Sequence, residues 1–456
     1  MKNRLGFQLL LSLFVCIMLP SCSSNSEAAA SNNPFDTIRV SANSLREKIV
    51  VISDLHLGND LSYSENVAHL ARLEEFLKEV RSSATVKELI LGGDIFDEWY
   101  IPTRANTYGG GSQADFIRKS VESNKGIFTQ LRGIINDGKI KLTYVPGNHD
   151  MGFTVENVNI ALPGVNQARD KGEKYGVGSY HPEGYPQIVI EHGHRYDFFS
   201  CLTPGANEAD APGATLPPGY FFARIAANSF TNPTTSEAAT KVPVVTLKDK
   251  SNAEQYTKFV YYNLWQKVMS KVIYVKDNFA DPIIVTNVGH YTKTYSINDI
   301  LPYNATDGSI QVNLYNGLFT QTAWNERQKY NNVSVMTNIN EALVGSLETQ
   351  FIDRQSDVQY FKDSLSTVRI VVFGHTHEAM LVPYNNAHGQ SCIYANSGTW
   401  EDLKTRDKNA AIDQDAQKMH FVVITPEKSN NKHLNVGLYQ YLHGKHALIS
   451  NKGIDL

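Results

Sequence analysis

Short apolar runs alternate along the chain with segments whose apolar residues recur every three or four positions. The runs predict strands at 48–53, 88–91, 141–145, 188–190, 368–373, 393–395 and 420–424. One apolar helical face is predicted from Val67, Leu70, Leu73, Phe76, Leu77 and Val80. A second helix is predicted over 116–135, with Gly138 at the position of a C-terminal cap. This alternation favours an α/β fold.

The stretch from 201 to 365 interrupts the alternation. It is far longer than the dozen or so residues that a crossover between parallel strands needs. Apolar residues from Phe259 to Val272 indicate an amphipathic helix within it, and Tyr and Phe are frequent around that helix. We therefore expect a largely helical inserted subdomain at 201–365 within a main domain formed by 38–200 and 366–456. A chain of 456 residues agrees with this division, because one hydrophobic core seldom grows beyond about 250–300 residues.

The first residues have the pattern of an export signal. Lys2 and Arg4 precede an apolar run, Leu9–Leu19, that is shorter than the roughly 20 residues a membrane span needs. The run leads into Leu-Pro-Ser-Cys at 19–22, which resembles a bacterial lipoprotein signal whose cysteine is lipidated and begins the mature chain. We expect a signal peptide at 1–22 and a lipid anchor at Cys22. An ordinary secretory signal is the alternative.

Both forms of the signal predict a chain exported from the cytoplasm, to the periplasm or the cell surface. Residues 23–37 are rich in Ser, Asn and Ala, a composition typical of a flexible tether. The predicted processing leaves Cys201 and Cys392, and the sequence permits a disulfide between them without requiring one. The formal net charge of -4 provides no basic field for a polyphosphate backbone, so we expect no nucleic-acid-binding surface.

Five short clusters of oxygen and imidazole donors follow one another along the chain, four of them directly after a predicted strand. They are Asp54-Leu55-His56, Gly93-Asp94-Ile95-Phe96-Asp97, Gly147-Asn148-His149-Asp150, His192-Gly193-His194 and Gly374-His375-Thr376-His377. The Asp-x-His, Gly-Asp and Gly-Asn-His sequences are ordinary turn sequences when each is taken alone. Gly374-His375-Thr376-His377 is more specific, because two imidazoles two residues apart beside a glycine have little structural purpose. Because the loops beyond the carboxyl ends of strands form the ligand crevice of an open α/β sheet, the five clusters together predict one site.

The chemistry of these donors favours metal binding. Carboxylates mixed with neutral imidazoles suit Mn, Fe, Zn or Co better than Ca or Mg. A single ion takes three or four protein ligands, whereas the chain offers seven candidates: Asp54, His56, Asp94, Asn148, His192, His375 and His377. Seven donors with one bridging carboxylate suit two divalent or trivalent ions about 3.5–4 Å apart.

The order of the clusters and the residues within each cluster resemble the calcineurin-like metallophosphoesterase superfamily. The resemblance covers the chain from Val50 to Trp400, excluding the insertion. The resemblance implies a two-sheet sandwich flanked by helices. It also implies that one metal is bound by Asp54, His56, Asp94 and His377, and the other by Asp94, Asn148, His192 and His375.

The resemblance further implies a catalytic pair, in which His149 faces the scissile phosphate and Asp97 orients it. His194 and Asp150 are expected to lie behind the metal ligands. Asn148 and Arg195 are candidate substrate contacts, Arg195 because an arginine directly after a ligand cluster can hold a phosphate. We therefore expect hydrolysis of a phosphomonoester or phosphodiester by metal-activated water, with His149 either stabilising the transition state or donating a proton to the leaving group.

The wording around Asp54 and Asp94 is most similar to the branch that contains UDP-diacylglucosamine pyrophosphatases. That branch acts on a cytoplasmic lipid intermediate, which an exported chain would not meet, so we expect its mechanism but not its substrate. The alternatives are a non-catalytic docking module on the same fold and a surface module that captures a ligand beside structural metals. For the insertion, we expect a cap over the metals; packing on the outer surface is its alternative.

Overall fold

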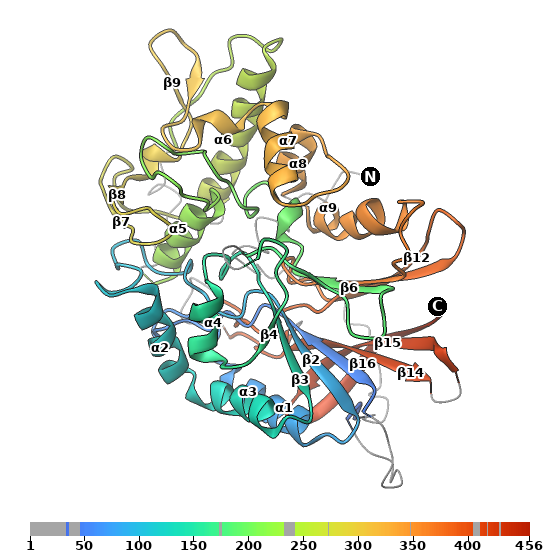
Figure 1. Cartoon of the computed structure of the whole chain (residues 1–456). Coiled ribbons are helices and arrows are strands. Elements are labelled where there is room, and N and C mark those ends of the chain that lie inside the picture. The colour runs from blue at the N-terminus through green and yellow to red at the C-terminus, as the bar shows by residue number, and fades with distance from the viewer. Residues whose placement is uncertain are drawn as a thin grey trace.

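The computed structural model describes residues 33–35, 46–172, 176–231, 242–271, 273–346, 348–404, 411–416, 418–427 and 430–456 (Figure 1). The predicted signal peptide lies outside the described residues, as does the predicted tether apart from 33–35. No helix in the described ranges is both long enough and apolar enough to cross a membrane. Cys201 and Cys392 are both buried and unpaired, so they form no disulfide.

Two mixed sheets form the centre of the main domain. The larger has the order β16 (Lys445–Asp455), β15 (Asn430–Leu442), β14 (His420–Glu427), β1 (Lys48–Ile52), β2 (Val86–Gly92), β3 (Lys141–Val145) and β4 (Asn166–Gln167). The smaller has the order β12 (Met380–Asn385), β13 (Ser391–Asn396), β11 (Ile370–Phe373), β6 (Ile188–Glu191) and β5 (Ser179–Tyr180). Strands β1 to β3 are parallel in one sheet, and β6, β11 and β13 are parallel in the other.

The two faces of each central strand pack against different layers. In β1, Ile49 and Val51 join an apolar layer shared by the two sheets, whereas Val50 and Ile52 belong to the larger cluster that includes the flanking helices. This follows from the two-residue side-chain period of a strand, and it explains why the strands read as continuous apolar runs. The predicted two-sheet sandwich flanked by helices is confirmed.

Helices α1 (Leu70–Ser82), α2 (Gln113–Ser123), α3 (Lys125–Asp137) and α4 (Val155–Ala161) belong to the main domain. The prediction of one helix over 116–135 is wrong, because the chain breaks at Asn124 into α2 and α3. The Asn124 side chain donates to the carbonyls of Gly58 and Ser120 and so supports the break. Gly138 does cap α3, with φ 61°. Helix α1 begins after Val67, which is 38% exposed and lies outside the predicted apolar face.

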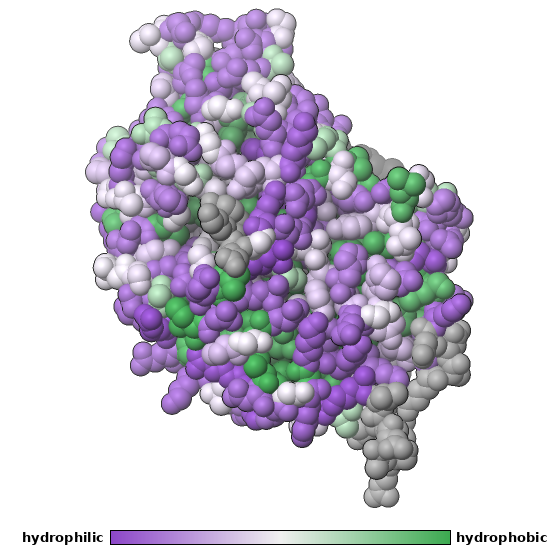
Figure 2. All heavy atoms as spheres, in the orientation of Figure 1, coloured by the Kyte–Doolittle hydropathy of each residue, from purple (hydrophilic) through white to green (hydrophobic). Residues whose placement is uncertain are grey.

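The inserted region contains the helices α5 (Gly219–Thr231), α6 (Ala253–Lys271), α7 (Gln321–Tyr330), α8 (Ile339–Gly345) and α9 (Thr349–Asp353). Its described residues also form two short hairpins, β7 (Ile284–Val285) with β8 (Thr294–Tyr295), and β9 (Tyr303–Asn304) with β10 (Ile310–Gln311). Most of these elements gather on one side of the sheets, in the upper part of Figure 1. The surface that this part presents in Figure 2 is mainly hydrophilic. Its interior is continuous with the main domain, because Phe221 and Tyr261 belong to the same buried cluster as Leu55 and Trp99.

Candidate metal centre

All five donor clusters begin within two residues of a strand end, after β1, β2, β3, β6 and β11. The sequence had indicated this for only four of them. Because β1 to β3 are parallel and β6 and β11 are parallel, the carboxyl ends of the strands in each sheet point the same way. The two sheets therefore bring together loops that lie more than 300 residues apart in the chain.

The structure brings all seven predicted ligands together. Among the described residues, three groups have ligand atoms within 4.8 Å of one another, and two of these groups consist of predicted ligands: Asp54 with His56 and His377, and Asp94 with His192 and His375. The third group combines His56 with Glu65, Asp97 and His149. Asn148 joins the second group, since its Oδ1 lies 3.2 Å from His192 Nε2.

Two carboxylates lie between these groups. Asp94 Oδ2 is 3.0 Å from His192 Nε2 and 3.9 Å from His56 Nε2. Asp54 Oδ1 is 3.1 Å from His377 Nε2 and 3.9 Å from His192 Nε2. Either carboxylate therefore has access to both groups.

The donor atoms fit metal ions. His56 Nε2 and His377 Nε2 lie only 3.4 Å apart. Asp54 lies close to His377, and Asp94 lies close to His192 and within 3.9 Å of His56. Facing nitrogen lone pairs repel one another unless a cation or a proton lies between them. Buried carboxylates and imidazoles within coordination reach of one another are the ligands expected for transition metals.

The backbone at five of the seven ligands is strained. Asp54, His56, Asp94, His375 and His377 have φ between 47° and 69°, the left-handed region that side chains other than glycine rarely adopt. Such a conformation costs about 1–3 kcal/mol per residue and occurs mainly where surrounding structure enforces it, often at functional sites.

A second set of groups fixes the outward nitrogens of the ligand rings. His56 Nδ1 lies 3.1 Å from Glu65 Oε2, His377 Nδ1 lies 3.2 Å from Glu401 Oε1, and His192 Nδ1 lies 3.0 Å from the carbonyl of Gly92. Such partners orient a ligand imidazole and raise its basicity. Sequence reasoning missed Glu65 and Glu401, because each is a single acidic residue in a loop and has no motif around it.

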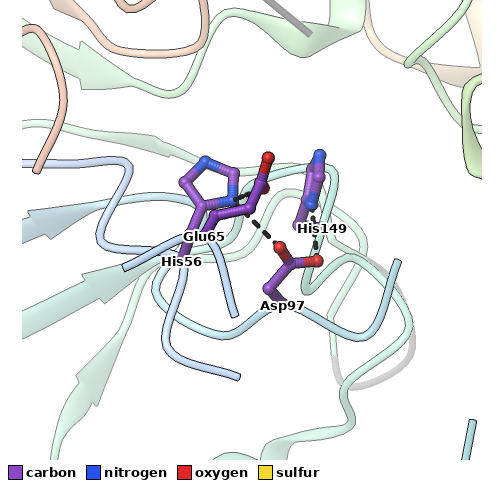
Figure 3. A group of neighbouring side chains, drawn as sticks. All are labelled: His56, Glu65, Asp97 and His149. Atoms are coloured by element: carbon purple, nitrogen blue, oxygen red, sulfur yellow. Dashed lines mark hydrogen bonds and ion pairs between the residues drawn. The ribbon is translucent and has the colours of Figure 1, made fainter. Parts of the chain in front are cut away.

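His149 is held by Asp97, as Figure 3 shows. His149 Nδ1 lies 2.7 Å from Asp97 Oδ1, and Asp97 Oδ2 lies 3.3 Å from His56 Nδ1. The backbone N–H groups of Trp99 and Tyr100 donate to Asp97 Oδ1, and the Trp99 ring stacks on His149 with centroids 4.8 Å apart. This arrangement fixes the ring and leaves its Nε2 on the side away from Asp97.

The charges of these residues are strongly coupled. Burial alone would raise the pKa of Asp94, but His192 and His149 outweigh it and hold that pKa well below its ordinary value. Burial opposes protonation of His192 and His377, yet their acidic neighbours raise the pKa of each to about 9. For His149, burial lowers the pKa and Asp97 and Asp94 more than compensate. The carboxylates therefore stabilise positive charge at His192, His377 and His149, whereas burial lowers the pKa of His375.

Arg195 does not reach this cluster. Its Nε lies 2.6 Å from Glu191 Oε2, its Nη2 lies 2.8 Å from Asp170 Oδ2, and its Nη1 donates to the carbonyl of Asn331. The side chain is also buried. These contacts engage all three guanidinium nitrogens, so they favour a structural role for Arg195 over the predicted contact with substrate.

The remaining cluster residues contact loop backbone. Asp150 accepts hydrogen bonds from the backbone N–H of Gly147 at 2.7 Å and of Ile95 at 2.9 Å, which joins two of the donor loops. His194 Nε2 lies 2.8 Å from the carbonyl of Gly176. Both side chains therefore shape the loops behind the donor atoms.

Comparison with known proteins agrees with this geometry. The family model described as calcineurin-like phosphoesterase matches residues 47–379, a span that includes all five donor clusters and the insertion. No curated protein matches the chain. The matched span is well over half of the chain and contains the buried His and Asp groups that could hold metal ions. The chain therefore belongs to the calcineurin-like phosphoesterase family, and it is a metal-dependent hydrolase of phosphoric ester bonds.

Proposed function

We propose that the chain binds two metal ions in one centre and hydrolyses a phosphomonoester or phosphodiester outside the cytoplasm. The observation that carries the proposal is the convergence of seven donors, six of them buried and His377 partly buried, from five strand-end loops. Asp54, His56, Asp94 and His377 would hold one ion, and Asp94, Asn148, His192 and His375 the other. When bound, two such ions supply a more acidic water molecule and neutralise charge on the phosphoryl oxygens.

His149 and Asp97 would handle the proton. Asp97 accepts from His149 Nδ1, so the imidazolium is stabilised and its Nε2–H is left to donate to the leaving oxygen or to a phosphoryl oxygen. Asn148 would contact the substrate phosphate as well as a metal ion. The Trp99 ring stacked on His149 keeps the imidazole from rotating away.

The location of the substrate rests on the export signal. The predicted signal at 1–22 and the anchor at Cys22 would put the enzyme on a bacterial membrane, periplasmic or at the cell surface, and its substrate in the same compartment. The similarity in wording to the UDP-diacylglucosamine pyrophosphatase branch supports a shared mechanism only.

The insertion would act as a cap that recognises the non-phosphate part of the substrate. The start of α5 lies directly on the catalytic loops, because Tyr220 contacts the Trp99 ring with centroids 6.2 Å apart. In addition, Ser346 donates to Asp197 and Asp353 accepts from Thr376, and both of these partners lie beside metal ligands. These contacts at several points of the site favour a cap over a module packed on the outer surface.

The test is an activity assay of residues 23–456, loaded in turn with Mn, Fe, Zn and Co. Small monoester and diester reporters are compared with larger exported nucleotide and phospholipid esters. We expect two ions per chain and turnover of one ester class. Two tightly bound ions with no turnover of any ester would favour the non-catalytic module instead, and fewer than two ions would refute the dinuclear centre.

A further inference from the structure

The loop that carries His375 and His377 is held in an unusual shape. Both residues have left-handed backbone, with φ 69° and 59°. The loop leaves β11 at Phe373, and two of its backbone N–H groups have partners nearby: that of His375 donates to the Asp54 carboxylate, and that of Thr376 donates to the Gly374 carbonyl. Thr376, between the two histidines, is buried, and its hydroxyl contacts the insertion and also accepts a hydrogen bond from the Asn396 amide at 3.0 Å.

Asp353, the last residue of α9, accepts the hydrogen bond from Thr376. The Thr376 hydroxyl lies 3.2 Å from Asp353 Oδ1. The same carboxylate oxygen accepts from the Tyr394 hydroxyl and from the Asn396 amide, which also donates to the carbonyl of Gly374. Asp353 is 4% exposed, so these groups replace the water that the carboxyl lost on burial. The insertion thus contributes the central acceptor of a network around the metal loop.

A second contact from the insertion reaches the same loop. Ser346, which follows α8, donates to Asp197 Oδ1 at 2.7 Å. Asp197 Oδ2 lies 3.3 Å from His375 Nε2. Ser346 and Asp197 are both buried. One residue of the insertion therefore fixes the middle of the loop, and another fixes the ring of His375 through Asp197.

We propose that Asp353 is a positioning residue for the metal centre, with Ser346 as a second support, so that the insertion forms part of the metal site and does not serve only as a cap. The inference rests on the proposed function, because it assumes that His375 and His377 bind metal. A consequence is that deleting the insertion through Asp353 would weaken metal binding as well as open the site. Any trimming of the cap must therefore keep α8 and α9.

The test measures metal affinity in Asp353→Ala, with Co²⁺ titration followed by visible absorption and with metal content after dialysis against a chelator. Loss of an outer support typically weakens metal binding about 10- to 100-fold, and we expect this range together with an altered Co²⁺ spectrum. Asn207→Ala is the matched control. Asn207 is also buried in the insertion, but it bonds to Tyr291 and Tyr315, neither of which belongs to the network around the loop. This control should lower thermal stability while it leaves Co²⁺ affinity and spectrum unchanged.

A pair of loop variants keeps the test decisive if Asp353→Ala does not fold. Thr376→Val removes the hydroxyl and keeps the side-chain shape, so it should weaken Co²⁺ binding in the same way, whereas Thr376→Ser should restore it. Wild-type affinity and spectrum in Thr376→Val, or in folded Asp353→Ala, would overturn the inference. If the wild-type chain itself binds fewer than two ions, the proposed dinuclear centre fails first, so the two failures are distinguishable.

Discussion

The pairing of His149 with Asp97 leads to a quantitative prediction for Asp97→Asn. The amide introduced by this substitution would keep an oxygen near His149 Nδ1, which lies 2.7 Å from the native carboxylate, but it would remove the negative charge. Both native side chains are almost fully buried, so water screens their interaction little. The substitution therefore tests the charge of Asp97 while it largely preserves the shape of the site.

The expected loss can be bounded from the contact. A hydrogen bond to a charged group contributes about 1.5–3 kcal/mol, which corresponds to about 10- to 150-fold in kcat. Removing the imidazole altogether, in His149→Ala, should cost about 10²- to 10⁴-fold, the usual range for a general acid. Both losses should shrink for esters with very good leaving groups, which need little protonation.

The assay is a double-mutant cycle at saturating metal, with kcat measured for esters of graded leaving-group pKa. If Asp97 acts through His149, Asp97→Asn should cost little in a chain that already carries His149→Ala. Both single variants should retain two metal ions.

Glu65→Gln is the matched control. Glu65 lies 3.1 Å from His56 Nδ1, and Asp97 Oδ2 lies 3.3 Å from the same nitrogen. The carboxylate that contacts His149 is that of Asp97. Loss of the Glu65 charge should weaken metal binding and leave kcat at saturating metal close to the wild-type value. If Asp97→Asn lowers kcat equally with and without His149, or loses activity only through metal release as Glu65→Gln does, the catalytic pair is wrong.

Three further predictions concern metal, packing and pH. Asp94→Asn should lose one or both metal ions and nearly all activity, whereas Asp54→Asn should lose at most one; two ions bound per chain in Asp94→Asn would refute the bridging assignment. Arg195→Met leaves a buried carboxylate unpaired and should cost about 3–5 kcal/mol in unfolding free energy, with kcat at saturating metal within a few-fold of wild type. A large change in KM instead would restore Arg195 as a substrate contact. Burial and the nearby Lys418 lower the pKa of His420 to about 4 from 6.5, so the contribution of this residue to stability is full above pH 6.5 and falls as pH drops toward 4. Between about pH 7 and about pH 5.5, the unfolding free energy of the wild type relative to His420→Phe should therefore fall by about 1 kcal/mol, and a difference that does not change with pH would refute this prediction.

The sequence predicted the main elements and the seven donors because both depend on local patterns. A buried strand must be apolar on both faces. A donor loop directly after such a strand forms a short motif that can be recognised in the sequence, as in Gly374-His375-Thr376-His377. The long antiparallel strands β15 and β16 escaped prediction. They lie at one end of the larger sheet, with β16 as its edge strand, and both contain many polar residues. Their formation depends on the pairing of β15 with β14 and of β16 with β15.

Contacts between distant segments determine the features of the site that the sequence did not predict. Glu65, Glu401 and Asp353 reach their partners only because the fold brings together loops from both sheets and the end of the insertion. No local sequence spacing indicates these contacts. Arg195 follows a ligand cluster in sequence, yet in the folded chain its guanidinium forms ion pairs with Glu191 and Asp170. Local sequence specifies which groups can act, whereas burial and long-range pairing determine which of them face the site, because hydrogen-bond and charge partners are chosen in space.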